Sequence, residues 1–383
     1  MKNGNYILKK RWIRTLVISS ACFAILAVLN FFGIFDSLEY KSYDYRVVKT
    51  AEKYTPSEDI GFIIVDQESI DWALENKGWS WPWPRESYAQ IIEFLSFGGV
   101  KTIAFDMLYT EPSLYGAQDD LKLAEAQKAS DRVIQTVFIT GSEETLKVQY
   151  PIEPIKNTAT ILGNITSVSD SDGLIRRGRI TYNLNGEEIP TLGMASVFLE
   201  NKKNNTELKD LPTLKDGTVL LRYQSSIENY IPYRASDILK SYDDWQSGAE
   251  DSLLVPNDFE NMYVFFALYA PGLFDICSTP VSQVYPGVGV HITTLDNYLS
   301  DSFITKLPDF ISYFWIFILA FIGSGLVIFP TKLHSHGKSI FVSGLGFIVA
   351  LCFGAFVPVF LFSIGFWILF VTPIVAMILS FMV

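Results

Sequence analysis

The long apolar runs at the two ends of the chain constrain its structure most. One uncharged run covers residues 15–35, and three more cover residues 310–329, 340–357 and 359–383. A helix needs about 20 apolar residues to cross the hydrocarbon core of a bilayer. The sequence therefore predicts four transmembrane helices, with a globular domain at residues 36–309 between the first and the second.

Charged residues beside these runs predict their orientation. Residues 1–14 contain three lysines, two arginines and no acidic residue, and the short loop 330–339 is also basic. Lysine and arginine accumulate on the cytoplasmic side of membrane proteins. We therefore expect both segments and both termini in the cytoplasm and the globular domain outside. A cleaved signal peptide is the alternative for residues 15–35, but the run exceeds the roughly 7–15 apolar residues of such peptides and lacks a small-residue cleavage site.

Charge and cysteine content limit the possible partners and cross-links. The net charge is −11 at pH 7, whereas nucleic acids require a basic face, so we expect no nucleic-acid partner. The cysteines are Cys22, Cys277 and Cys352, and only Cys277 lies in the globular domain. No disulfide can form within that domain. For Cys277 a buried thiol is favoured over an intermolecular bridge.

The globular domain contains an aromatic–proline sequence, Trp79-Ser-Trp-Pro-Trp-Pro-Arg85, between two strand-like runs at residues 60–66 and 101–108. Between residues 85 and 97, apolar side chains recur every three or four residues, which predicts a helix. The order strand, turn, helix, strand predicts a βαβ unit with parallel strands and a right-handed crossover. We expect an α/β fold, a mostly parallel-sheet sandwich of βαβ units, on a four-helix transmembrane anchor.

Other segments have recognisable patterns. Apolar, β-branched runs predict buried strands at residues 133–140 and 263–269, and Asn-Gly at residues 185–186 predicts a hairpin turn. Residues 141–157 are polar and interrupted by prolines, so we expect an irregular excursion. Further predicted elements are a strand at 220–223 and helices at 36–54, 119–129, 191–200, 236–242 and 288–299.

Four separated motifs resemble one known family. The run IIVDQESI…WSWPWPRESYAQIIEFLSFGGVKTIAFDMLYTEP resembles the signature of the type-2 CHASE domain, an extracytoplasmic sensor module of bacterial signalling proteins. GNITSVSDSDGLIRRGRI (163–180), APGLFDICSTP (270–280) and PGVGVHITTLDNYL (286–299) match it further downstream. The resemblance covers most of residues 35–307. It implies a homodimeric sensor in the bacterial cytoplasmic (inner) membrane, with a cyclase or kinase output that would lie outside this chain.

The carboxyl ends of the predicted parallel strands hold the best candidates for a ligand site. Asp66 and Asp106 end two strands, and Asp275 follows a third. Open α/β sheets place their sites at this edge, so these carboxylates are candidates to bind a cation or polar ligand. The alternative is that they cap helices. Arg85 begins a helix, where the dipole disfavours a cation; it is expected to contact either Asp66 or Asp106, or a substrate.

The aromatic–proline signature admits two interpretations. It consists of Trp81, Pro82, Trp83 and Pro84. Aromatic clusters can stack on sugars or other rings. Rings that alternate with prolines can also form a rigid plug over the sheet, and this interpretation is favoured.

No motif in the chain predicts a catalytic residue, a metal site or a cofactor. Asp170-Ser-Asp-Gly173 resembles the start of a calcium loop but lacks the later ligands, so a tight turn is favoured. His334 and His336 lie in the short basic loop and are interpreted as ordinary loop residues rather than metal ligands. His291 has no visible nucleophile partner, which favours a packing role.

These observations support three functional hypotheses. The first is a sensory receptor that detects a small-molecule or ionic stimulus outside the cell and relays it through the bilayer. The second is a membrane-tethered extracytoplasmic enzyme that uses the aspartate cluster. The third is transport, which the uncharged apolar runs disfavour, because transport pathways usually contain charged groups.

Overall fold

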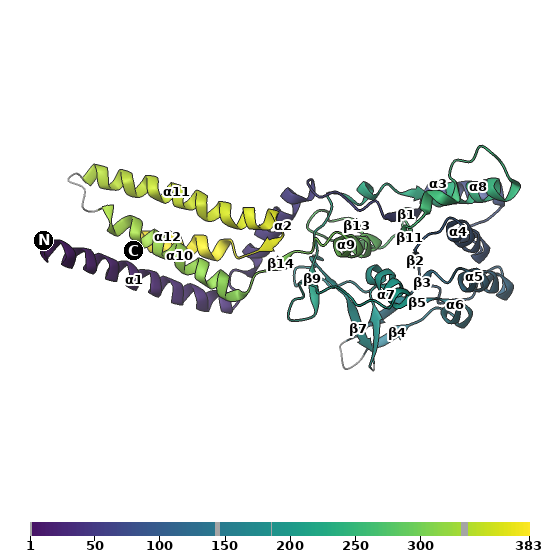
Figure 1. Cartoon of the computed structure of the whole chain (residues 1–383), viewed down its shortest axis with the longest axis horizontal. Coiled ribbons are helices and arrows are strands. Elements are labelled where there is room, and N and C mark those ends of the chain that lie inside the picture. The colour runs from purple at the N-terminus through teal and green to yellow at the C-terminus, as the bar shows by residue number, and fades with distance from the viewer. Residues whose placement is uncertain (1, 142–145, 185, 331–335) are drawn as a thin grey trace. The chain divides into compact units, whose positions relative to one another are not determined.

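The computed structural model describes residues 2–141, 146–184, 186–330 and 336–383. By their internal contacts these residues form two units. Ala51–Phe303 make an α/β unit, and Met1–Thr50 together with Ile304–Val383 make a helical unit. Both units are drawn in Figure 1.

The α/β unit is built on one seven-stranded sheet, whose strands are β1 (Ile60–Val65), β2 (Thr102–Asp106), β3 (Val133–Thr140), β4 (Lys147–Gln149), β5 (Ile161–Asn164), β10 (Tyr233–Arg234) and β11 (Tyr263–Leu268). The order is β10-β1-β11-β2-β3-β4, and β5 also pairs with β3. The described pairs are parallel except for β3–β4. The prediction of a mostly parallel sheet is therefore confirmed.

Helices cover both faces of this sheet, which explains why its central strands are apolar along their whole length. One face packs against α3 (Gln67–Lys77), α4 (Arg85–Phe97), α5 (Ala117–Ser130), α6 (Glu153–Thr158) and α8 (Ala235–Ser247). The other face carries α7 (Leu192–Asn204) and α9 (Gly287–Leu299). Figure 1 shows these two layers on opposite sides of the sheet.

The predicted βαβ unit is correct in direction and incomplete in detail. β1 and β2 are parallel, but they are not neighbours, because β11 lies between them and pairs with both. Helix α3 was not predicted in the turn region, although Asp66 caps its start and Gly78, with φ +69°, ends it. In the excursion predicted as irregular, the described residues form β4 and α6.

Smaller elements complete the α/β unit. The predicted hairpin is formed by β7 (Thr181–Leu184) and β8 (Glu187–Pro190). The remaining elements are β6 (Arg177–Arg179) paired with β9 (Thr218–Leu220), β12 (Ile276–Cys277) paired with β13 (Tyr285–Pro286), and the 3₁₀ turns η1 (Ile227–Tyr230) and η2 (Pro256–Phe259).

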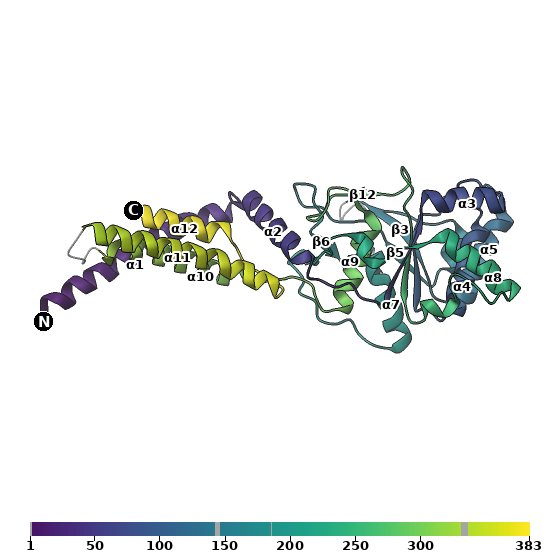
Figure 2. The same cartoon turned by 90° about the horizontal axis from the view of Figure 1, so that it is seen from above.

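The helical unit consists of α1 (Lys2–Phe31), α2 (Asp36–Ala51), α10 (Asp309–Ile328), α11 (His336–Ser363) and α12 (Val371–Met382), with the short strands β14 (Thr305–Lys306) and β15 (Phe366–Trp367). Helices α10 and α12 pack against α1, and α11 packs against α10 and α12 (Figure 1 and Figure 2). Three described helices are long and apolar enough to cross a membrane: Leu8–Phe31 within α1, α10 and α11.

The prediction of one continuous span at residues 359–383 is wrong. Helix α11 continues through Pro358 to Ser363, and the chain then breaks before α12 begins. Helix α12 has 12 residues, which is about 18 Å at about 1.5 Å per residue. It is shorter than the hydrocarbon core of about 30 Å. A four-helix transmembrane anchor is therefore not confirmed.

Gly193 of α7 provides a test of how α7 packs on α9. A Cβ atom at this position would lie 2.3 Å from the carbonyl oxygen of His291. We predict that Gly193→Ala lowers the free energy of unfolding by about 1–3 kcal/mol, because overpacking outweighs the usual helix preference for alanine. Denaturant unfolding of the full chain in detergent measures this.

Lys202→Ala is the matched control for Gly193→Ala, because Lys202 is exposed on the same helix. We expect it to change the free energy of unfolding by less than about 0.5 kcal/mol. If Gly193→Ala instead raised the stability, the close approach of α7 to α9 would be wrong.

Candidate functional site

Asp66 has a structural role at the end of β1. Its Oδ1 accepts hydrogen bonds from the backbone N–H of Ser69 at 2.8 Å and from the Ser69 hydroxyl at 2.6 Å. Its Oδ2 lies 2.8 Å from Nε of Arg234. Burial acts to raise the pKa of Asp66, but these hydrogen bonds hold it below its usual value. The capping interpretation fits this residue.

Arg85 also has protein partners, but not the expected ones. Its Nε lies 3.5 Å from Oδ1 of Asp120, and its guanidinium lies 4.2 Å from the centre of the Tyr109 ring. The expectation that Asp66 or Asp106 is its partner is wrong. The distant helix α5 supplies the carboxylate, and the spacing of residues along the chain could not show that pairing.

A second carboxylate of α5, Asp119, caps α4. Its side chain accepts hydrogen bonds from the backbone N–H groups of Arg85 at 2.6 Å and Glu86 at 2.9 Å. The N-cap residue Pro84 has no side-chain hydrogen bond of its own to offer. Nothing in the sequence indicated that Asp119 and Asp120 bind the start of α4. Acidic residues are common in the first turn of any helix, because the helix dipole favours them there.

Asp106 and Asp275 come together at a cavity of about 430 Å³ at the carboxyl end of β2. Its polar lining consists of Asp106, Thr166, Ser167, Asp275, Cys277 and His291. Its apolar lining consists of Phe138, Ile165, Ile175, Leu268, Leu273 and Phe274. Asp66 and Arg85 do not line it. Of the four predicted ligand residues, the structure therefore brings two together at one hollow.

The charge of this cavity is negative. Burial and, to a smaller extent, the Asp275 carboxylate together raise the pKa of the Asp106 carboxyl to about 7. Burial raises the pKa of the Cys277 thiol to about 12, again with a contribution from Asp275. Burial lowers the pKa of His291 to about 4, so its imidazole is neutral at pH 7. Among the described lining residues there is no lysine or arginine.

His291 lines the cavity and is buried. Its side chain is 4% exposed, and its Nε2 lies 3.3 Å from the carbonyl oxygen of Ile165, to which it donates. This fits the packing role. The described residues contain no group of three or more histidine, cysteine, aspartate or glutamate side chains that could hold a metal ion. His334 lies outside the described residues.

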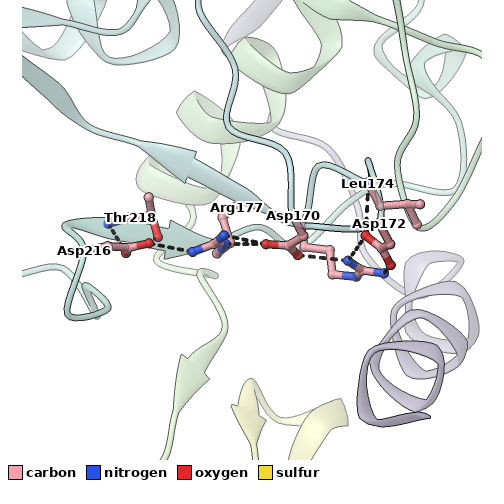
Figure 3. Close-up of polar contacts among 7 residues, drawn as sticks. Asp170, Asp172, Leu174, Arg177, Asp216 and Thr218 are labelled. Carbon is pink, nitrogen blue, oxygen red and sulfur yellow. Dashed lines mark hydrogen bonds and ion pairs between the residues drawn. The ribbon is translucent and has the colours of Figure 1, made fainter. Parts of the chain in front are cut away.

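The Asp170–Gly173 sequence forms a tight turn held by arginines (Figure 3). The N–H of Gly173 donates to the carbonyl oxygen of Asp170 at 2.9 Å. The Asp170 carboxylate, which is almost fully buried, binds Arg176 at 2.9 Å and Arg177 at 2.5 Å. Arg176 also binds Asp172 at 2.7 Å. The carboxylates of the supposed calcium loop therefore neutralise arginines, and the tight-turn prediction is confirmed.

The aromatic–proline signature lies in the core of the α/β unit. Trp83 is 1% exposed, and its ring contacts those of Trp81 and Tyr88 at centroid distances of 6.0 and 6.3 Å. Trp81 is partly buried against the same core. The plug interpretation agrees with this placement, since the rings pack onto the sheet rather than line the cavity.

In the sequence, the α/β unit lies between helices that are long and apolar enough to cross a membrane. The model of the CHASE2 domain family matches residues 21–325. This match covers more than half of the 383 residues, so the chain belongs to the CHASE2 family, a family of sensory domains. No curated protein and no solved structure gives a significant match.

Asp170 is predicted to be essential for stability. Asp170→Asn would leave the buried guanidinium of Arg176 and its neighbour Arg177 without their shared carboxylate. Breaking a buried ion pair from one side costs about 3–5 kcal/mol. We expect a loss of about 3 kcal/mol in the free energy of unfolding, measured by denaturant unfolding of the full chain.

The control is Asp216→Asn, because Asp216 binds Arg177 at 2.6 Å but its side chain is 45% exposed. Exposed pairs contribute about 1 kcal/mol or less. Equal losses for the two variants would contradict the special role of the buried carboxylate.

A pH titration tests the environment of Asp106. Its pKa in the folded state is raised to about 7, so its protonated form stabilises the fold, and this stabilisation is lost as the pH rises from about 4 through 7. Asp106→Asn removes the titration. The free energy of unfolding of the variant minus that of the wild type should increase by about 2 kcal/mol from pH 4.5 to pH 8. This value is reduced for the partial solvation of the carboxyl. A pH-independent difference would contradict the burial of this carboxylate.

Proposed function

We propose that this protein is a membrane-bound sensory receptor whose α/β unit binds a small cationic ligand outside the cell. The observation that carries the ligand class is the cavity with Asp106 and Asp275. Two carboxylates at one partly apolar cavity repel each other. A bound cation relieves that repulsion and offsets the solvation that both carboxylates lose on burial.

The shape and lining of the cavity favour an organic ammonium ion over a bare metal ion. A volume of about 430 Å³ falls within the range of small-molecule pockets, roughly 300–1,000 Å³. Aromatic and aliphatic side chains such as Phe138, Leu268 and Phe274 line half of it. They offer an apolar surface to the body of a ligand whose charged group faces the carboxylates.

The sensory assignment is supported by membership of the CHASE2 family, and the membrane assignment by three helices of sufficient length and hydropathy. The basic residues before the first apolar run support a cytoplasmic N-terminus. We infer that the α/β unit lies outside the cytoplasm and that the helical unit relays its state to a cyclase or kinase output. A homodimer is the expected functional form.

Thermal unfolding of the full chain in lipid nanodiscs tests the ligand site. The panel contains Na⁺, K⁺, Mg²⁺, Ca²⁺, phenethylammonium, agmatine and spermidine, with phenylethanol as an uncharged control. We predict a saturable rise in melting temperature with an organic ammonium ion, which corresponds to about 2.7 kcal/mol at a concentration 100 times its dissociation constant.

Two variants make this experiment specific. The double variant Asp106→Asn, Asp275→Asn should lose the ligand-dependent shift, whereas Asp66→Asn should keep it, because Asp66 caps α3 and does not line the cavity. A shift that persists in the double variant would exclude this cavity as the site. The absence of a shift with every cation would exclude the proposed ligand class.

A further inference from the structure

The connection between α11 and α12, residues 364–370, is here named the junction loop. It lies inside an uninterrupted apolar run of the sequence. Backbone N–H and C=O groups in apolar surroundings need partners within the protein. In the helical unit, those partners come from two other segments, α2 and β14.

Glu39 of α2 caps α12. Its carboxylate accepts hydrogen bonds from the backbone N–H groups of Phe370, Val371 and Thr372, each at 2.9 Å. The N-cap residue Phe370 has no side-chain hydrogen bond of its own. The first N–H groups of a helix lack partners within the helix, and the helix dipole favours a negative charge there. Glu39, which is 3% exposed, supplies both the acceptors and the charge.

Arg46 and Tyr43 of α2 hold the middle of the junction loop. Nη1 of Arg46 donates to the carbonyl oxygen of Ile368 at 3.1 Å. Its guanidinium lies over the ring of Phe370 at 5.9 Å, and the Tyr43 ring contacts that of Trp367 edge-on at 5.3 Å. Positions 39, 43 and 46 lie on one face of a helix. One face of α2 therefore contacts the junction loop.

Strand β14 holds the other side of the junction loop. It pairs with β15 in parallel, with Thr305 opposite Phe366 and Lys306 opposite Trp367. The N–H of Thr305 donates to the carbonyl oxygen of Gly365 at 2.8 Å, and the N–H of Leu307 donates to that of Trp367 at 3.0 Å.

These two segments are also the two places where the helical unit connects to the rest of the chain. Helix α2 leads directly into the α/β unit at Ala51, and β14 follows directly after its last residue, Phe303. Both covalent connections therefore reach a segment that binds the same loop. The same loop sets the position of the N-terminus of α12.

We propose that the junction loop is a coupling element, through which a displacement of α2 relative to β14 is transmitted to α12. The inference goes beyond the sensory function, since it assigns the step between the sensor and the membrane helices to named contacts. Helix α12 is suited to receive the displacement, because Ala376 packs with Ile316 and Ala320 of α10 and Leu26 of α1 in one buried cluster.

Hydrogen exchange of the full chain in lipid nanodiscs tests this proposal through Glu39→Gln. The substitution keeps the size of the side chain and removes its charge, which weakens the charge-assisted bonds to the start of α12. We expect exchange at residues 370–372 to become about tenfold faster. Because the loop is shared, exchange at Thr305 and Leu307 should also become faster, although neither contacts Glu39.

The matched control is Glu52→Gln, because Glu52 is exposed and should change exchange at neither place. If Glu39→Gln fails to insert into the membrane, Glu39→Asp, which keeps the charge and shortens the side chain, replaces it and should have the same effect in both segments. Faster exchange at residues 370–372 with none at Thr305 and Leu307 would overturn the proposal. So would unchanged exchange at residues 370–372.

Discussion

The parallel pairing of β11 with both β1 and β2 is the constraint on which the α/β unit depends. Val264 and Phe266 of β11 belong to the buried hydrophobic core, and each of the three strands is buried along nearly all of its length. Parallel strands end at the same edge of a sheet. Asp106, at the end of β2, therefore lies beside the end of β11. The segment after β11 contains Asp275, and the two carboxylates line one cavity as a consequence.

A second constraint acts in the helical unit, where apolar surroundings leave backbone groups without water. The helix is interrupted between α11 and α12. Backbone amides and carbonyls that lack helical partners there are bound by Glu39, Arg46 and β14. Glu39 and Arg46 are both almost fully buried. Burial lowers the pKa of Arg46 to about 10, while Glu39 acts in the opposite direction.

Local patterns in the sequence predicted local structure well. Strand β3 and helix α4 have the predicted bounds, because burial on both faces and a three-to-four-residue repeat leave clear signals. The insertion of β11 between β1 and β2 was not predictable, since it depends on two pairings, across about 160 residues to β2 and about 200 residues to β1. The break after Ser363 left no signal in hydropathy, because its partners Glu39 and β14 lie more than 50 residues away. The site was partly predicted: strand ends identify Asp106 and Asp275 as candidates, but only the fold shows that these two share a cavity and that Asp66 and Arg85 do not line it.

The most direct test of the account is hydrogen exchange of the full chain in lipid nanodiscs with and without a saturating cation that raises its melting temperature. The account predicts changed exchange around Asp106 and Asp275 together with changed exchange in the junction loop and at the start of α12. A change confined to residues 51–303 would contradict it, because binding at the cavity would then leave the helical unit unaffected.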